Sequence, residues 1–409
     1  MKILHTADWH LGKRLHDHSR LPEQREVLAE ICEVAEREAV DVVLIAGDLY
    51  DTFKPSNEAT ELFYRTVHRL ADQGRRAVVA IAGNHDSADG VQAPDPLARE
   101  CGIVFLGRPT STVPLTRLKS GLEITRSAPG FVELCVPSCG CPLRLLLTPY
   151  ANEALMRRFL GTEEREEALR QLLEEHWRTL ADEHCDPAGV NLLMAHLYVM
   201  RADGPPPEEP DDERPILYLG GAQAIHTANL PPQIQYAALG HLHRHQVVSR
   251  EPCPVVYSSS PLAYSFSEAD QSKYVVIVEA EPGQPVRMRP VELTSGRRLK
   301  RRRFDDVDEA VAWLTKNPDT FVELTLVSDT YVDAATKKRL YDAHDGIVGI
   351  IPELKLPDGP AGSDALRRVD VQQDLRALFR NYFAYKRRQQ PNDVLLSLFD
   401  EVVSVREDA

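Results

Sequence analysis

The chain has 409 residues, of which 43% are hydrophobic and 27% charged, and its formal net charge is −14. This composition is that of a folded protein of two or three domains and excludes a disordered chain, while the acidic balance argues against indiscriminate binding to nucleic acids. No apolar run reaches the roughly 18 to 20 residues that span a bilayer, and polar residues from position 5 onward exclude a signal peptide, so we expect a cytoplasmic protein.

The first hundred residues alternate between apolar runs and amphipathic segments. A short apolar run, "KILHTAD", is followed by a predicted helix over about 22–39, a buried strand over 40–48, a second helix over about 56–72 and another strand over 77–86. Continuous apolar strands that alternate with helices indicate a largely parallel sheet that is covered on both faces. The pattern predicts an α/β fold.

Further along, the same theme returns with histidines at the strand ends. We predict a long amphipathic helix over about 163–184, and two apolar strands, 189–196 and 235–243, that each end in histidine. Between these strands, the proline-rich acidic segment 201–215 is expected to be a surface loop. Two later apolar runs, "PVVYSSSP" and "KYVVIVEAE", complete a first domain over 1–280.

The last part of the chain has a different composition. The basic run "GRRLKRRRF" begins at 296, and strand and helix patterns over 285–352 predict a small α/β capping domain. A Pro- and Gly-rich break at 356–364 separates it from residues 365–409. There, apolar residues at helical spacing predict two short amphipathic helices that bind a partner.

The seven cysteines give no sign of a disulfide framework, because their number is odd and they are spread along the chain. "CVPSCGC" at 135–141 crowds Cys135, Cys139 and Cys141. This spacing has no matching downstream pair for zinc, so we interpret these residues as free thiols.

Metal-capable side chains follow five of the predicted strands. They are Asp8 and His10, Asp48, Asn84 with His85 and Asp86, His196, and His241 with His243. Each piece has an ordinary explanation by itself, since an aspartate often caps a helix and a lone histidine often packs in a core. In open α/β folds, however, the ligand crevice lies beyond the carboxyl ends of the strands. Five such pieces at that edge indicate one site.

The ligand types narrow the metal and the chemistry. Carboxylate, imidazole and amide oxygen without thiolate suit Mn²⁺, Fe or Zn²⁺ in a catalytic site. Seven candidate ligands exceed the needs of one ion, whereas two ions about 3.5 to 4 Å apart that share a bridging aspartate would use them all. A pair of this kind clamps a phosphoryl group, which points to phosphoester hydrolysis.

Taken together, "D-x-H", "G-D", "G-N-H-D", "H" and "G-H-x-H" resemble the signature of the calcineurin-like metallophosphoesterases. The stretches "ILHTADWHLGK", "AGDLYDTFKPS", "GNHDS", "ALGHLHRHQ" and "YSSSPLAYSF" are further similar to bacterial double-strand-break repair nucleases of that superfamily. The resemblance is dense over residues 1–280. It implies a metallophosphoesterase sandwich of mixed β-sheets flanked by helices, with a capping domain and C-terminal helices that bind an ABC-type ATPase.

The resemblance also implies roles for individual residues. One Mn²⁺ would be held by Asp8, His10, Asp48 and His243, and a second by Asp48, Asn84, His196 and His241. His85 would face the scissile phosphate and stabilise the transition state or protonate the leaving oxygen, and Asp86 would orient His85. His245 has no such role and is expected to be structural or to lie near the DNA backbone.

Contacts with nucleic acid are less defined by the sequence. Lys13 and Arg14 follow the first metal ligands, and Arg301 and Arg302 lie in the basic run, where they form either a phosphate-tracking patch or a solvated face. Three departures from the family pattern are Asp51, where archaeal relatives often carry a histidine, Ser259, where glycine is usual, and the acidic loop 201–215, which could repel DNA.

The sequence therefore predicts a Mn²⁺-dependent DNA nuclease subunit. The resemblance implies 3′–5′ exonuclease action on duplex ends, endonuclease action on hairpin or single-stranded DNA, and a homodimer within a heterotetramer with the ATPase. Two alternatives remain open at this point: a small-molecule phosphodiesterase or phosphatase with the same core, and a DNA-tethering scaffold without catalysis.

Overall fold

The computed structural model describes residues 1–151, 165–208, 225–328 and 332–354, together with nine residues between 379 and 399. The chain divides into two compact units. The first comprises Met1–Val327 and Tyr331–Glu353, and the second comprises Ser328–Thr330 and Leu354–Ala409. The fold and the site described below belong to the first unit.

The first sheet has six strands, and β1 lies near its middle. The four strands β1, β4, β5 and β6 are parallel, whereas β17 and β18 are antiparallel additions beside β1. Their order across the sheet is β18 (Arg287–Leu293), β17 (Lys273–Glu279), β1 (Lys2–Thr6), β4 (Val42–Ile45), β5 (Ala77–Ile81) and β6 (Ile103–Leu106). The expected parallel strands are confirmed, but the sheet is mixed.

The second sheet has eight strands and is also mixed. Four neighbouring strands, β16, β14, β11 and β10, run parallel to one another, and those at both edges are antiparallel. The order is β15 (Gln246–Ser249), β16 (Val255–Tyr257), β14 (Tyr236–Gly240), β11 (Val190–His196), β10 (Leu143–Thr148), β9 (Phe131–Cys135), β8 (Glu123–Ala128) and β7 (Thr116–Arg117).

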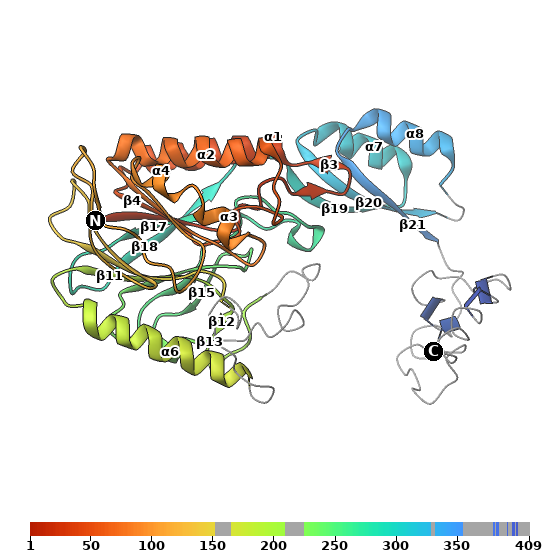
Figure 1. Ribbon diagram of the computed structural model, residues 1–409. Coiled ribbons are helices and arrows are strands. Elements are labelled where there is room, and N and C mark those ends of the chain that lie inside the picture. Colours follow the sequence, from red (N-terminus) through yellow and green to blue (C-terminus); the bar gives the residue numbers. More distant parts are fainter. Residues whose placement is uncertain are drawn as a thin grey trace. The chain divides into compact units, whose positions relative to one another are not determined.

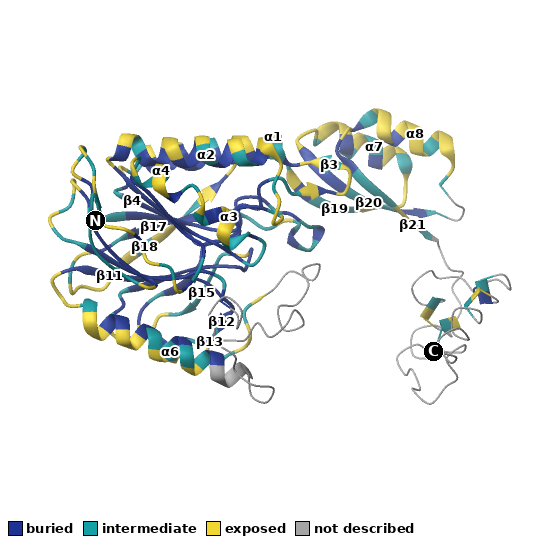
Figure 2. Ribbon diagram, viewed as in Figure 1, coloured by how far each residue is buried: buried dark blue, intermediate teal, exposed yellow. Residues whose placement is uncertain are grey.

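The two sheets pack face to face between outer layers of helices (Figure 1). An apolar cluster that includes Val42, Leu44, Leu192 and Met194 fills the space between the sheets. On the outside, α1 (Leu21–Arg37) and α2 (Asn57–Ala71) cover the first sheet, and α6 (Arg165–His184) covers the second. Both sheets are buried throughout their central strands (Figure 2). The first sheet is therefore covered by helices on one face and by the second sheet on the other.

Shorter elements complete this domain. Among the residues that the structure describes, they are the hairpin of β2 (Arg14–Leu15) and β3 (His18–Ser19), the helices α3 (Ala88–Gln92) and α4 (Asp95–Arg99), the parallel pair β12 (Val199–Met200) and β13 (Ile225–His226), and the 3₁₀ turns η1 (Asp72–Gly74), η3 (Thr227–Asn229) and η4 (Phe266–Glu268).

The capping domain is a three-stranded sheet with two helices on one face. Its strands, β19 (Arg298–Phe304), β20 (Thr320–Ser328) and β21 (Ile347–Leu354), lie in that order, and α7 (Val307–Lys316) and α8 (Ala334–Ala343) pack on them. Asp306 begins α7 by accepting the N–H groups of Asp308 and Glu309. The expected domain boundary at 280–285 is too early, because β18 pairs with β17 and belongs to the first sheet.

A single aromatic ring of the capping domain is clamped by two arginines. The guanidinium carbons of Arg20 and Arg297 each lie 5.2 Å from the centre of the Phe321 ring. The Glu23 carboxylate contacts both arginines. It forms an ion pair with the guanidinium of Arg20 at 2.5 Å and accepts the backbone N–H of Arg297 at 2.7 Å. An apolar cluster of Leu15, Phe266, Leu299 and Phe321 adjoins this clamp. The capping domain is thus seated on the start of α1 by cation–π and apolar contacts.

Several sequence expectations outside the site can be compared with the structure. All seven cysteines lie in the described part and are free thiols. In the second unit, Phe379 stacks on Phe399 with ring centres 4.2 Å apart. Most of 365–409, including Leu375, Leu378 and Val394, lies outside the described residues, as does 209–215 of the expected acidic loop. Within the described ranges, no helix combines the length and apolarity needed to cross a membrane.

Candidate metal centre

The seven proposed ligands meet at one edge of the two sheets. Asp8 and His10 follow β1, Asp48 follows β4, and Asn84 follows β5, all in the first sheet. His196 ends β11, and His241 and His243 follow β14 in the second sheet. Because these strands are parallel within each sheet, their carboxyl ends coincide, and residues from distant parts of the sequence are brought together.

The first cluster is built around His10 and His243. Their Nε2 atoms face each other at 3.0 Å, and Oδ2 of Asp48 lies 3.5 Å from Nε2 of His10. Donor atoms of Asp8, His10 and Asp48 all lie within 4.8 Å of one another. These residues are completely or almost completely buried, and their donor atoms lie close enough together to share a cation.

The second cluster is built around Asn84. Its Oδ1 lies 2.9 Å from Nε2 of His196 and 3.0 Å from Nδ1 of His241. Oδ2 of Asp48 lies 3.4 Å from the same Nε2 of His196. Because Nδ1 of His196 contacts the carbonyl of Ala46 at 2.8 Å, and a carbonyl only accepts, Nδ1 carries the hydrogen and leaves Nε2 as the donor atom for a metal.

Asp48 belongs to both clusters. One of its oxygens, Oδ2, stands between His10 and His196, while Oδ1 accepts the backbone N–H of His85 at 2.9 Å. This is the position in which a carboxylate could bridge two ions.

Two features of the chain show that the site fits metal ions. Oδ2 of Asp8 is a buried carboxylate oxygen without a hydrogen-bond partner among the described residues, and such orphaned atoms are rare unless an ion or water satisfies them. In addition, Asp8, His10, Asp48 and His241 all have positive φ, between 42° and 107°. Strained backbone of this kind costs about 1 to 3 kcal/mol per residue and clusters at functional sites.

Glycines allow the close approach of the ligands. A Cβ atom on Gly83 would lie 2.1 Å from Oδ1 of Asp48, and one on Gly47 would lie 2.2 Å from Nδ1 of His196. Distances of this size exclude any side chain at either position without movement of a ligand. Gly47 and Gly83 are therefore required because they leave space for the side chains of His196 and Asp48.

Burial and charge crowding shift the pKa values of the ligands. Burial raises the pKa of Asp8 to about 7, and Asp48 adds to this shift. Burial also opposes the charged form of His196, but Asp48, Asp8 and the Ala46 carbonyl together outweigh it and raise the pKa of His196 to about 9. For His10 and His241, burial lowers the pKa well below its usual value. Crowding of this kind among buried groups is typical of functional sites.

His85 lies at the side of the first cluster, and its ring centre is 4.8 Å from that of His10. Its Nδ1 contacts the backbone carbonyl of Asp51 at 3.0 Å. Because the carbonyl only accepts, Nδ1 carries a hydrogen, and Nε2 is the nitrogen left to meet a substrate. His10, Asp51 and His85 also form a third group of donor atoms within 4.8 Å, although Oδ1 of Asp51 pairs with Lys13 at 3.0 Å.

The expected contact between Asp86 and the His85 ring is a prediction that the structure corrects. The Asp86 carboxylate accepts three backbone N–H groups instead, from Gly83 at 2.8 Å, Leu49 at 3.0 Å and Tyr50 at 2.9 Å. It therefore ties the loop after β5 to the loop after β4. The backbone of Asp51, rather than the side chain of Asp86, fixes the His85 ring.

The four basic residues proposed to contact nucleic acid differ in their surroundings. Lys13 pairs with Asp51 beside the first cluster, and exposed Arg14 donates to the carbonyl of Asp17. Arg301 pairs with Glu323 at 2.7 Å, and Arg302 lies over the Trp313 ring at 5.2 Å and near Asp270. The run 297–303 is therefore no unopposed basic patch, because it forms strand β19 with acidic partners.

Other residues singled out in the sequence have structural surroundings. Nδ1 of His245 contacts the carbonyl of Tyr257 at 3.1 Å, in agreement with the structural interpretation. Ser259 has φ of 97°, the left-handed region that favours glycine, and its hydroxyl bonds both backbone groups of Tyr274. In the acidic loop, Glu208 forms an ion pair with Arg244 next to His243.

Sequence reasoning missed two buried residues beside His243. Glu268 contacts Nδ1 of His243 at 3.5 Å, and Lys273 pairs with Glu268 and donates to the His243 carbonyl. The only local signal is the Ser265–Glu268 capping box of η4. That pattern predicts a turn and says nothing of a histidine that lies 25 residues away in the sequence.

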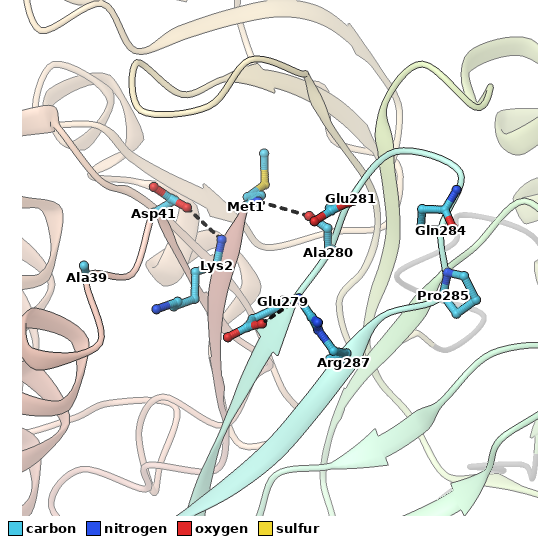
Figure 3. Close-up of a pocket in the computed structure, with 10 residues that line it drawn as sticks. All are labelled: Met1, Lys2, Ala39, Asp41, Glu279, Ala280, Glu281, Gln284, Pro285 and Arg287. Carbon is cyan, nitrogen blue, oxygen red and sulfur yellow. Dashed lines mark hydrogen bonds and ion pairs between the residues drawn. The ribbon is translucent and has the colours of Figure 1, made fainter.

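A separate cavity of about 550 Å³ lies at the opposite end of β1, where the strand starts. Figure 3 shows that several of its lining residues pair with each other. The backbone N–H of Lys2 donates to Asp41, the terminal ammonium of Met1 donates to the Ala280 carbonyl, and Arg287 pairs with Glu279. This cavity has no share in the metal centre.

The protein has two packed mixed sheets, and at one edge of them lie two donor clusters that share Asp48. This combination defines a metallophosphoesterase. In agreement, the family model of the calcineurin-like phosphoesterases matches residues 1–245.

Full-length relatives narrow the family. Over 99% of this chain and 98% of the relative, the sequence is 34% identical to the SbcD component of the nuclease SbcCD from Bacillus subtilis. It is 35% identical to the SbcD protein of Rhodobacter capsulatus, over 71% of this chain and 69% of the relative, and 28% identical to that of Staphylococcus epidermidis, over 83% of each. The chain belongs to the SbcD family of nuclease components.

Proposed function

We propose that this protein is a metal-dependent DNA nuclease subunit that works with an ABC-type ATPase of the SbcC kind. The observation that carries the proposal is the double donor cluster with Asp48 in common, which is suited to phosphoester hydrolysis. The names of the relatives, which match along almost the whole chain, support DNA as the substrate and SbcC as the partner.

In this proposal, one Mn²⁺ would be held by Asp8, His10, Asp48 and His243. The other would be held by Asp48, Asn84, His196 and His241. When bound, two such ions offset the negative charge that develops on the phosphoryl oxygens and activate a water molecule. The donor set of carboxylates, imidazoles and an amide oxygen suits Mn²⁺, and other divalent ions of similar preference could replace it.

His85 is proposed to complete the reaction. With Nδ1 held by the Asp51 carbonyl, Nε2 is the ring atom that can give a proton to the oxygen that leaves phosphorus. Lys13, three residues after His10 in the chain and paired with Asp51, is proposed to contact a neighbouring phosphate of the DNA backbone. The Asp86 carboxylate connects the loop that carries His85 to the loop that carries Asp51.

The remaining parts of the proposal concern activity and assembly. We infer 3′–5′ exonuclease action on double-stranded ends, endonuclease action on single-stranded or hairpin DNA, a homodimer within a heterotetramer, and a location in the cytoplasm. The capping domain, whose strands and helices lie between Arg298 and Leu354, is proposed to contact DNA, and residues 365–409 are proposed to bind the ATPase. Further candidates for DNA contacts are Arg14, Arg301 and Arg302. Arg301 and Arg302 are weaker candidates than Lys13 because they already face acidic residues.

The test is a nuclease assay with Mn²⁺ on blunt duplex and hairpin DNA, with and without the partner ATPase, together with a count of bound metal per chain. We expect His85→Ala to keep two Mn²⁺ per chain and to lose cleavage by about 10²- to 10⁴-fold, the usual contribution of a positioned proton donor. A His85→Ala protein that binds fewer ions would make His85 a ligand through its group with His10 and Asp51.

Two other outcomes would contradict the proposal. Rapid hydrolysis of nucleotide monoesters without cleavage of DNA would identify a small-molecule phosphatase. Failure to bind Mn²⁺ at saturating concentration would indicate a DNA-tethering protein without catalysis.

A further inference from the structure

A buried carboxylate that belongs to neither donor cluster lies beside the first one. Glu268, at the end of η4, is 1% exposed. Its Oε1 accepts the backbone N–H groups of Tyr264 at 3.0 Å and Ser265 at 3.2 Å, and it lies 3.5 Å from Nδ1 of His243. The carboxylate thus reaches the side of the His243 ring that points away from His10.

Lys273, at the start of β17, holds Glu268 and His243 together. Its buried ammonium forms an ion pair with Oε2 of Glu268. It also donates to the backbone carbonyl of His243 at 2.8 Å and to Oγ of Ser260 at 3.0 Å. The Glu268–Lys273 pair therefore grips His243 at two points, the ring and the backbone.

This grip decides which nitrogen of His243 can serve as a ligand. A carboxylate next to Nδ1 favours the form of the ring in which Nδ1 carries the hydrogen, and the lone pair is then on Nε2. Nε2 is the atom that faces His10 at 3.0 Å. In the second cluster the neutral carbonyl of Ala46 does the same for His196. Each cluster thus contains a histidine whose outer nitrogen is fixed by a neighbour.

We propose that Glu268 and Lys273 are positioning residues, which fix the orientation and tautomer of His243 for the metal that it would share with His10. This inference rests on the proposed metal centre and adds two residues to it. Stability does not explain the pair, because replacing a buried ion pair by neutral residues is often neutral or stabilising. Its contacts with a proposed ligand do explain it.

The experiment measures metal binding without any substrate. Mn²⁺ is titrated into the metal-free full-length protein, and affinity and stoichiometry are followed by calorimetry and by electron paramagnetic resonance. In Glu268→Leu, which removes the acceptor altogether, we expect one of two Mn²⁺ sites to weaken by about 10- to 100-fold, the usual effect of losing a partner of a metal-bound histidine. The second site, which has no contact with Glu268 in the described structure, should keep its affinity within a few-fold.

Two further variants separate positioning from folding. Glu133→Gln breaks another buried ion pair, that of Glu133 and Arg144 at 2.8 Å, and should leave both Mn²⁺ affinities unchanged. The double variant Glu268→Leu/Lys273→Met removes the acceptor beside His243 and leaves no unpaired buried charge. It should fold even where the single variant does not, and should show the same weakened site.

The outcomes are distinct from those that test the function. If the unaltered protein binds two Mn²⁺ and the Glu268 variants bind both with unchanged affinity, the positioning role is wrong and the proposed function stands. An equal weakening in Glu133→Gln would also overturn the inference, because the effect would then be one of general stability. If the unaltered protein binds no Mn²⁺, the proposed function itself fails.

Discussion

The Nε2 atoms of His10 and His243 face each other at a distance of 3.0 Å, and both side chains are almost completely buried. Two imidazole nitrogens in this arrangement can share at most one proton between them, and Oδ2 of Asp48 stands 3.5 Å from the same Nε2 of His10. A cation between them would satisfy all three atoms at once. Without metal, the lone pairs of the two ring nitrogens and the carboxylate oxygen therefore face one another unfavourably. A bound cation would remove this repulsion.

We accordingly expect Mn²⁺ to stabilise the folded protein strongly and a chelator to reverse the effect. A ligand at 100 times its Kd stabilises the folded state by about 2.7 kcal/mol per site, which is a rise in Tm of several degrees. The measurement is thermal unfolding with and without Mn²⁺. Asp48→Ala is the control, because it removes the residue common to both clusters. An identical rise in Tm in that variant would mean that Mn²⁺ binds elsewhere.

The space beside Gly83 gives a second prediction. A Cβ at Gly83 would lie 2.1 Å from Oδ1 of Asp48, so Gly83→Ala should displace that carboxylate and weaken both metal sites by at least tenfold. Gly140→Ala is a matched control, since a Cβ there meets no atom within 4 Å. Metal titration of the two variants checks this. Equal affinities would show that the loop after β5 can move without cost to Asp48.

The pKa values predict how metal binding depends on pH. A ligand must lose its proton before it binds a cation, and the pKa values of Asp8 and His196 are raised to about 7 and about 9. Mn²⁺ affinity should therefore increase as pH rises from about 6 to about 9, by up to about tenfold per pH unit for each proton released. Titrations in buffers of different ionisation enthalpy would count these protons.

The same shifts have the opposite consequence for the metal-free protein. A group with a raised pKa binds its proton more tightly in the folded state than in the unfolded state. The stability that this proton contributes is therefore present at low pH and is lost as pH rises. The loss should occur between 3.8 and about 7 for Asp8, and between 6.5 and about 9 for His196. A metal-free Tm that rises over the upper range would contradict this assignment of charges.

Asp86 offers a direct test of the corrected role. Asp86→Ala removes the acceptor of three buried backbone N–H groups, so we expect a loss of about 3 kcal/mol or more in the free energy of unfolding. Urea unfolding of the metal-free protein measures this loss. A variant that keeps its stability and loses only the cleavage rate would support the original expectation that Asp86 acts on His85.

The sequence could predict that the proposed ligands lie close together, for a physical reason. Asp8, Asp48, Asn84 and His196 are polar residues that interrupt long apolar runs, and parallel strands bring such interruptions to one edge. The pairing of Glu268 with His243 was not predictable, because their contact depends on how the loop before β17 folds back.

Charge partners across a sheet were missed for the same reason. The run from Arg297 to Arg303 was interpreted as a free patch or linker, but Arg301 and Arg303 meet Glu323 and Glu353, which lie on other strands. The boundary near 280 was also too early, since nothing in 287–293 indicates that this segment pairs with β17 rather than with the capping domain. Local pattern identifies strands and leaves their partners open.

The place of β1 in its sheet has a consequence for how the protein can be produced and divided. One side of β1 pairs with β4, but the other pairs with β17, which follows more than 260 residues later in the chain. During synthesis, β1 therefore keeps an open, apolar edge until β17 has emerged, and open edges of this kind are templates for aggregation. A fragment that stops at residue 245, where the match to the family model ends, would retain all seven proposed ligands and still expose that edge. The smallest unit that covers this edge extends through β17, to Glu279, and the complete sheet extends through β18, to Leu293.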